Sequence, residues 1–363
     1  MAAKFSIVPG DLLPAGHPPE HIHGGSLDWA EARFGRPKAG WVDLSTGINP
    51  KAYPFQVPPD AAWRRLPDAL EISNLKQAAA DRYKVSDPSL IVPAPGSQSL
   101  IQLLPRLRGA SHVEVLSPTY SEHAVAWRAE SHRIFEIADI DMLACDASVV
   151  VVTNPNNPDG RIISPDVLLE VADQMSSRGG WLVVDEAFSD TLPETSLASY
   201  TGQDGLIILR SFGKFYGLAG LRLGFALAPS NLALEITTKL GPWPVAGPAI
   251  AIAVEALSDD AWHTKAHQLL EASATRLDRL LYKAGLSVIG GTPLFRLVID
   301  ERAHIVFEAL GREGILVRHF PENRKWLRIG IPENETAFAR LEEALTDFSD
   351  VSRACLLGAE TTP

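Results

Sequence analysis

Short runs of apolar residues, many of them β-branched, recur between residues 90 and 230 and alternate with helix-like segments. Runs such as SVVVVT and WLVVDE are apolar at successive positions, as expected of central strands that are covered on both faces. The pattern therefore predicts an α/β fold with helices on both sides of a sheet. The predicted strands are Leu90–Val92, His112–Leu116, Arg133–Ile137, Ser148–Thr153, Trp181–Asp185, Leu206–Arg210 and Leu223–Leu227.

Helix signals lie before and between these strands. Ser164 is followed by proline at the first helical position, which predicts a helix that ends before Gly179. A stripe at helical spacing predicts an earlier helix that begins near Asn74, with Leu75, Ala78, Ala79 and Arg82 on one face. Because strands and helices alternate, we expect one large domain with a mostly parallel sheet.

The pattern changes after about residue 240, where the segment GPWPVAGP interrupts it. A helical stretch from Pro248 to about Ala284 follows, with a break near residues 258–260. The apolar segments LFRLVID, GILVRHF and WLRIGIP then alternate with helices near 301–312 and 333–348, which predicts a small α+β domain. We therefore divide the chain into an N-terminal arm that forms part of the small domain (1–45), a large domain (46–240) and a small C-terminal domain (241–363).

Composition narrows the class of protein. The 363 residues are 46% hydrophobic and 21% charged, which is typical of globular proteins. The net charge of −11 disfavours nucleic acid and anionic membranes as partners. Cys145 and Cys355 lie far apart, which disfavours a disulfide framework. The histidines of HPPEHIHGG lack a Cys or carboxylate cluster, which disfavours a metal site. No apolar stretch approaches the ~20 residues that span a bilayer. We expect a cytoplasmic protein without a signal peptide or a metal site.

Polar residues follow the ends of three central strands. Lys214 lies in SFGKFYG after LIILR, Asp185 ends WLVVD, and Asn157 lies in NPNNPDG after SVVVVT. Open α/β sheets bind ligands at this edge, where a lysine can form a Schiff base. The buried carboxylate of Asp185 needs a partner, such as a protonated ring nitrogen, because an isolated buried charge is unfavourable. The alternatives are a solvated loop lysine and a simple turn.

An anion site is predicted beside these residues. The segment APGSQS follows a strand and opens a helix, so the amides of Ser97 and Gln98 can face a phosphate. Ser211 and Arg222, on either side of Lys214, add a hydroxyl group and a guanidinium group. The set predicts a phosphate held beside a lysine, an asparagine and an aspartate.

The ordered motifs GSQS, NPNNPDG, DEAF, SFGKFYGLAGLRLG and LRIG resemble the fold type I pyridoxal-phosphate enzymes of the class I/II aminotransferase superfamily, over nearly the whole chain. Within it, His23-Gly24-Gly25, LSTGINP at 44–50 and Phe188 in DEAF resemble the threonine-phosphate decarboxylase branch, a relative of the histidinol-phosphate aminotransferases. The resemblance implies pyridoxal 5′-phosphate in a large seven-stranded domain, a small domain, and a homodimer with shared active sites.

The resemblance also implies roles for the residues above. Lys214 binds the cofactor covalently, Asp185 pairs with its ring nitrogen, and Asn157 donates to its 3′-oxygen. Tyr120 in LSPTYSEH stacks on the ring, with ordinary core packing as its alternative. The implied phosphate cup consists of Gly96, Ser97, Gln98, Ser211 and Arg222.

Substrate contacts are implied as well. Arg328 in LRIG matches the arginine that binds the substrate carboxylate, and Arg318 in LVRHF is a second candidate. His23 and the amides of the two glycines after it are candidate contacts for a substrate phosphate, with packing of the arm as the alternative. Tyr53 is a weaker candidate for the partner subunit's phosphate site, because its spacing from Asn49-Pro50 departs from the aminotransferase pattern.

The reaction implied is decarboxylation of L-threonine O-3-phosphate to (R)-1-amino-2-propanol O-2-phosphate and carbon dioxide in cobalamin biosynthesis. Phe188 stands where histidinol-phosphate aminotransferases usually carry a tyrosine, which argues against simple transamination. Two alternatives stay open. One is an aminotransferase for histidinol phosphate or a similar amino acid, and the other is a non-catalytic pyridoxal-phosphate sensor fused to a DNA-binding module, which the acidic composition disfavours.

Overall fold

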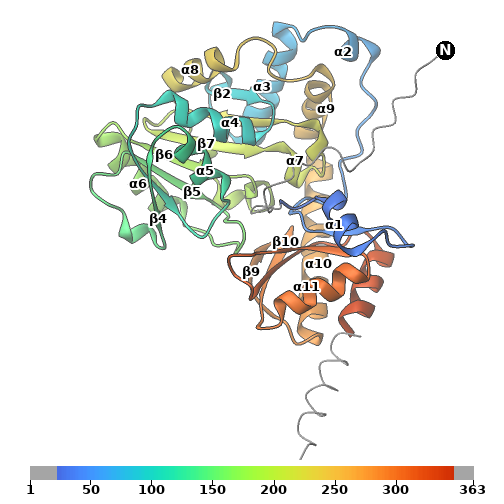
Figure 1. Cartoon of the computed structure of the whole chain (residues 1–363). Coiled ribbons are helices and arrows are strands. Elements are labelled where there is room, and N and C mark those ends of the chain that lie inside the picture. Colours follow the sequence, from blue (N-terminus) through green and yellow to red (C-terminus); the bar gives the residue numbers. More distant parts are fainter. Residues whose placement is uncertain (1–22, 347–363) are drawn as a thin grey trace, which may run out of the picture.

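The computed structural model describes residues 23–346 and contains two β-sheets, shown one above the other in Figure 1. Residues 1–22 of the predicted N-terminal arm, Cys355 and the predicted end of the last helix lie outside the described residues. No helix within residues 23–346 combines the length and the apolar character needed to cross a membrane.

The larger sheet has seven strands in the order β2-β8-β7-β6-β5-β3-β4. Strands β3 to β7 run parallel, and β8 is antiparallel to both of its neighbours. The seven predicted strands and the mostly parallel α/β fold are confirmed, with small shifts at strand ends. The strands are β2 (Ile91–Ala94), β3 (His112–Leu116), β4 (Arg133–Ile137), β5 (Val149–Thr153), β6 (Trp181–Asp185), β7 (Leu206–Ser211) and β8 (Gly224–Leu227).

The central strands are apolar on both faces because each face has its own layer of helices. Val150 and Val184 belong to one hydrophobic cluster, and their neighbours Val151 and Val183 belong to the cluster on the opposite face. The first cluster includes α3 (Ala69–Tyr83), α6 (Pro165–Ser177) and α9 (Gly247–Leu257), and the second includes α4 (Ser97–Leu103), α5 (Glu122–Ala129) and α8 (Ser230–Leu240). This arrangement explains the continuous apolar runs.

Helix starts follow their capping residues. The side chain of Ser164 accepts a hydrogen bond from the Val167 amide, so the predicted start of α6 is confirmed. The predicted start of α3 near Asn74 is wrong. Asp68 and Glu71 form a reciprocal capping box, and this satisfies the amides at the true start of the helix.

The smaller sheet has five strands in the order β1-β11-β12-β10-β9, with β1 parallel to β11 and the other pairs antiparallel. Its hydrophobic cluster includes residues of α1 (Leu27–Phe34), α10 (Asp260–Lys283), α11 (Ala303–Arg312) and the helical residues 335–346. Residues 27–44 thus pack with the C-terminal part of the chain, while the three-part division itself stays a prediction. The strands are β1 (Val42–Leu44), β9 (Ser287–Thr292), β10 (Phe295–Ile299), β11 (Ile315–His319) and β12 (Trp326–Gly330).

Two short helices, α2 and α7, also belong to the described chain. Helix α2 (Asp60–Arg64) precedes α3, and α7 (Phe212–Phe215) follows β7 without a break. Helix α7 carries Lys214 and begins where β7 ends, at the carboxyl edge of the larger sheet, and Figure 1 shows α7 on the side of that sheet nearer the smaller one.

Candidate active site

A cavity of about 230 Å³ lies at the carboxyl ends of β5, β6 and β7 and is also lined by Arg328 of the smaller sheet. It brings together most of the residues singled out in the sequence, together with Thr46, Gly47 and Phe188. Gly25, Arg318 and Tyr53 are not among its lining residues. The predicted residues that line it are His23, Gly24, Gly96, Ser97, Gln98, Tyr120, Asn157, Asp185, Ser211, Lys214, Arg222 and Arg328.

Lys214 is largely buried in this cavity. Burial lowers the pKa of its amine from 10.5 to about 8, and the positive charge of Arg328 acts in the same direction, while Asp185 opposes them. A lowered pKa increases the fraction of neutral amine at physiological pH, and the neutral amine is the nucleophilic form. The position and the pKa of Lys214 therefore suit covalent chemistry with a carbonyl group.

Asp185 ends β6 with 3% of its surface exposed. One carboxylate oxygen accepts a hydrogen bond from the Ala187 amide at 3.0 Å, and the other lies 2.9 Å from Nε2 of His123. His123 lies on α5 and is 1% exposed. The sequence reasoning missed it; its signal was a histidine three positions after Tyr120, at the start of the helix that follows β3.

Asn157 lies in a loop that the side chain of Asn156 anchors, by donating to the Pro118 carbonyl at 2.9 Å and to Asp159 at 2.7 Å. The side-chain oxygen of Asn157 accepts a hydrogen bond from the guanidinium of Arg328. A second nitrogen of Arg328 donates to the Ser45 carbonyl at 2.8 Å. Asn157 lines the cavity, and this bond occupies its side-chain oxygen and leaves its amide nitrogen as the available donor.

The predicted phosphate cup depends on two glycines. A Cβ at Gly96 would lie 2.7 Å from a guanidinium nitrogen of Arg222, and a Cβ at Gly224 would lie 2.4 Å from the backbone nitrogen of Ser97. Gly96 has φ +79°, a conformation that favours glycine. The guanidinium and the first amide of α4 can thus approach a common point, as an anion site requires.

Tyr120 is half-buried beside this cup. Its hydroxyl donates to the side-chain oxygen of Gln98 at 3.2 Å, and burial raises its pKa to about 12. Its ring meets the ring of His123 edge-on at 6.1 Å. The hydroxyl group is therefore neutral at physiological pH.

Arg318 and Arg328 lie directly opposite each other on β11 and β12. Burial and the charge of Arg318 lower the pKa of Arg328 to about 9, and burial also lowers the pKa of Arg318. Within residues 23–346 neither arginine forms an ion pair with a carboxylate, and Nε of Arg328 is buried without a hydrogen-bond partner. Like charges in this arrangement favour binding of an anion between or beside them.

The three remaining candidates contact other groups. His23 lies at the cavity edge, with Nε2 3.4 Å from Glu122. The Gly25 amide donates to the Ser45 hydroxyl at 2.7 Å, so it is already occupied and does not support the predicted phosphate contact. The Tyr53 hydroxyl lies 3.2 Å from Glu255 and 3.3 Å from Asp259 of the same chain, and its contact with a partner subunit's phosphate stays a prediction.

Asn49 contacts the backbone that carries Lys214, and no role was predicted for it from the sequence. Its backbone amide donates to the Lys214 carbonyl at 2.8 Å, and its side chain donates to the Phe215 carbonyl at 2.8 Å. It is 3% exposed. Asn49 therefore fixes the backbone that carries the lysine, and its only signal in the sequence was a polar residue within LSTGINP.

Comparison with known proteins assigns this architecture to a family. Residues 60–345 match the family model described as aminotransferase class I and II. The chain is 44% identical over 335 residues to a threonine-phosphate decarboxylase of Pseudomonas aeruginosa, covering 90% of this chain and 98% of that protein. It is 44% identical over 328 residues to a threonine-phosphate decarboxylase of Sinorhizobium sp., covering 89% and 97%.

The fold is similar to that of solved structures. A histidinol-phosphate aminotransferase from Sinorhizobium meliloti in complex with pyridoxal-5′-phosphate superposes with a TM-score of 0.76 and 20% identity, covering 89% of this chain and 94% of that one. The family match, the similarity in sequence and the shared fold agree. The chain belongs to the aminotransferase class I and II family.

Proposed function

We propose that this chain is a pyridoxal-phosphate-dependent lyase that decarboxylates L-threonine O-3-phosphate to (R)-1-amino-2-propanol O-2-phosphate and carbon dioxide, within cobalamin biosynthesis. The observation that carries the proposal is 44% identity, over 90% of this chain, to a threonine-phosphate decarboxylase. The positively charged regions around Arg222 and around Arg328 support the proposal, because both the cofactor and this substrate carry a phosphate group.

The residues of the cavity fit pyridoxal 5′-phosphate, the cofactor of this family. They offer an amine with a lowered pKa at Lys214, a buried carboxylate at Asp185, and a cradle at Gly96 that a Cβ would fill. Lys214 would hold the cofactor covalently, and the cup of Gly96, Ser97, Gln98, Ser211 and Arg222 would hold its phosphate. When bound, the cofactor supplies an electron sink for the bond that breaks at the substrate's α-carbon.

We assign the polar side chains around that ring to proton and charge control. The carboxylate of Asp185 would keep a proton on the ring nitrogen, because a nearby negative charge favours the protonated form. The amide nitrogen of Asn157 would donate to the ring oxygen, and the ring of Tyr120 would cover one face. Phe188 is 4% exposed and packs edge-on against Phe295 at 5.2 Å, so it gives the cavity an apolar wall where a tyrosine would add a hydroxyl group.

Lys214 would also act on the substrate. Decarboxylation removes the carboxyl group as carbon dioxide and leaves the α-carbon in need of one proton. The amine of Lys214, with a pKa of about 8, can hold and return a proton at neutral pH, either directly or through water.

The substrate phosphate provides the means of orienting the bond that breaks. An arginine that fixed the substrate carboxylate in the plane of the ring would favour loss of the α-hydrogen and hence transamination. We therefore assign the phosphate to Arg328, in place of the carboxylate that the resemblance implies for it, with Arg318 on the neighbouring strand and His23 at the cavity edge as further contacts. No arginine would then fix the carboxylate in the orientation that favours loss of the α-hydrogen.

We further propose a cytoplasmic homodimer. The segment from Val57 to Leu70 exposes several large apolar side chains, with 83% of Val57, 62% of Trp63 and 68% of Leu70 accessible to solvent. Large apolar side chains exposed close together along one segment support an interaction site there. Light scattering tests this proposal, because a homodimer has twice the mass of the single chain in solution.

A product assay tests the reaction. The cofactor-loaded protein is incubated with L-threonine O-3-phosphate and no 2-oxo acid, and we expect steady release of carbon dioxide with no 2-oxo product. Lys214→Ala is the control and should release none. Product that forms only after 2-oxoglutarate is added would instead identify an aminotransferase.

A further inference from the structure

The Asn157 loop touches the smaller sheet at a second point, away from Arg328. There Gly290 and Gly291 of β9 face Asp159 and Gly160 of the loop. A Cβ at Gly290 would lie 2.0 Å from the Asp159 carbonyl oxygen, and a Cβ at Gly160 would lie 2.0 Å from the Gly291 carbonyl oxygen. The two backbones are therefore in direct contact, which a side chain at either position would prevent.

This contact lies in the same row of the sheet as Arg328. Leu297 of β10 is paired with Gly290 on one side and with Arg328 on the other. The row formed by Gly290, Leu297 and Arg328 thus meets the loop at both ends, at Asp159 and at Asn157. Because hydrogen-bonded strands move together, the distance between Gly290 and Asp159 limits how closely Arg328 can approach Asn157.

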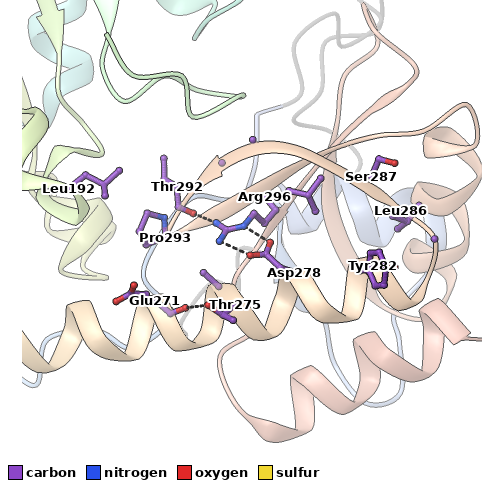
Figure 2. A pocket seen from close by; sticks show the side chains of 15 residues that line it. Leu192, Glu271, Thr275, Asp278, Tyr282, Leu286, Ser287, Thr292, Pro293 and Arg296 are labelled. Carbon is purple, nitrogen blue, oxygen red and sulfur yellow. Dashed lines mark hydrogen bonds and ion pairs between the residues drawn. The ribbon is translucent and has the colours of Figure 1, made fainter. Parts of the chain in front are cut away.

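The opposite side of β9 is braced, as Figure 2 shows. The guanidinium of Arg296 binds both carboxylate oxygens of Asp278 on α10, at 2.6 and 3.0 Å, and donates to the Thr292 carbonyl at 2.5 Å. A Cβ at Gly291 would also lie 3.1 Å from the side chain of Arg296. Arg296 and Asp278 also line an open cavity of about 980 Å³ between α10 and β9.

We infer that Gly290 is a positioning residue for Arg328. The missing side chain lets the smaller sheet approach the loop until the guanidinium of Arg328 reaches Asn157. A methyl group at this position would hold the row away from Asp159 and withdraw Arg328 from the cavity. The inference rests on the proposed function only for its substrate, since the contact itself lies within the chain.

The test compares Gly290→Ala with Gly109→Ala in the cofactor-loaded enzyme. Gly109 is a matched control, because a Cβ there would have no atom within 4 Å and neither glycine has a left-handed φ. We expect Gly290→Ala to raise KM for L-threonine O-3-phosphate at least ~tenfold, since a misplacement of about 1 Å can cost ~100-fold in activity. Cofactor absorbance should be unchanged, and Gly109→Ala should behave as wild type.

A second measurement does not depend on the reaction. Phenylglyoxal modifies accessible arginines, and Arg328 is 7% exposed, so peptide mass spectrometry reports its withdrawal as faster modification. We expect several-fold faster modification in Gly290→Ala. If wild type fails to release carbon dioxide while this acceleration is seen, the proposed function is wrong and the positioning role stands.

Two further variants separate positioning from general damage. In an Arg328→Met background, Gly290→Ala should have little additional effect on KM, whereas independent effects would multiply. Asp278→Asn weakens the brace without adding volume and should also accelerate modification of Arg328. It replaces Gly290→Ala as the test variant if Gly290→Ala does not fold. Unchanged modification in the folded variants, or effects on KM that multiply fully in the double variant, overturns the inference.

Discussion

The imidazole of His123 lies 2.9 Å from the carboxylate of Asp185, and both side chains are almost inaccessible to solvent. A carboxylate only accepts hydrogen bonds, so Nε2 of His123 carries the proton in this pair. With the Ala187 amide on the other oxygen, both oxygens of Asp185 are held. The helix α5 thereby fixes the direction in which this carboxylate faces the cavity.

Replacing His123 should therefore weaken catalysis through Asp185. A hydrogen bond to a charged group is worth about 1.5–3 kcal/mol, so His123→Leu should lower kcat by about tenfold to a hundredfold. His123→Asn can still donate and should recover part of the loss. Steady-state kinetics measure this, and the pH dependence of cofactor absorbance should shift in His123→Leu, which a purely structural role would not cause. Wild-type kcat in His123→Leu would contradict the role.

The lowered pKa of Lys214 predicts how capture of the cofactor depends on pH. Below pH 8 the amine is protonated and not nucleophilic, so the capture rate of the apoprotein should rise with pH and level off above about 8, well below the ordinary value of 10.5. The same shift opposes folding at pH values below 8, and this cost fades as pH rises toward 10.5. Stopped-flow absorbance after mixing with pyridoxal 5′-phosphate gives the midpoint.

Arg328→Met provides the control for this pH dependence. Burial is the main cause of the shift and the charge of Arg328 is the second, so the variant should move the midpoint upward from about 8 without restoring 10.5. A midpoint near 10 in the wild-type protein would show that the amine is not held in the environment described.

Much of the fold was predictable because its signals are local. The strands β5 and β6 are continuous apolar runs, and Ser164-Pro165 marks a helix start by itself. Strand β9 was not predicted, because it contains two glycines and lies at a sheet edge with much of its surface exposed. The start of α3 was misplaced because the stripe begins inside a helix that Asp68 caps.

The candidate site was predictable where residues follow strand ends. Lys214, Asp185 and Asn157 could be placed together because parallel strands end at one edge. His123 and Asn49 could not be assigned roles, because their importance lies in contacts with residues 62 and 166 positions away along the chain. Such pairings depend on the packing of α5 and of the segment near Pro50, which no local pattern encodes.

Asn49 predicts a test of stability. Asn49→Ala leaves the buried carbonyl of Phe215 without its donor, and an unsatisfied buried group costs about 1–3 kcal/mol. Urea unfolding should show a loss of free energy of unfolding in that range. Asn231→Ala, at an exposed position on α8, should change it by less than about 0.5 kcal/mol. Equal stabilities of the two variants would contradict the anchoring role.

Arg210 lies directly before Ser211 and is buried between two carboxylates. It donates to Glu186 at 2.7 Å and also binds Asp190. Arg210→Met would leave both carboxylates buried without a counter-charge, so the free energy of unfolding should fall by about 3–5 kcal/mol at pH 7. Burial already raises the pKa of Glu186, so lowering the pH should protonate this unpaired buried carboxylate and reduce the loss.

Arg64→Met, which removes an exposed pair with Asp60, should cost at most about 1 kcal/mol. Calorimetry at several pH values distinguishes these cases, and a loss in Arg210→Met that grows on acidification would contradict this account.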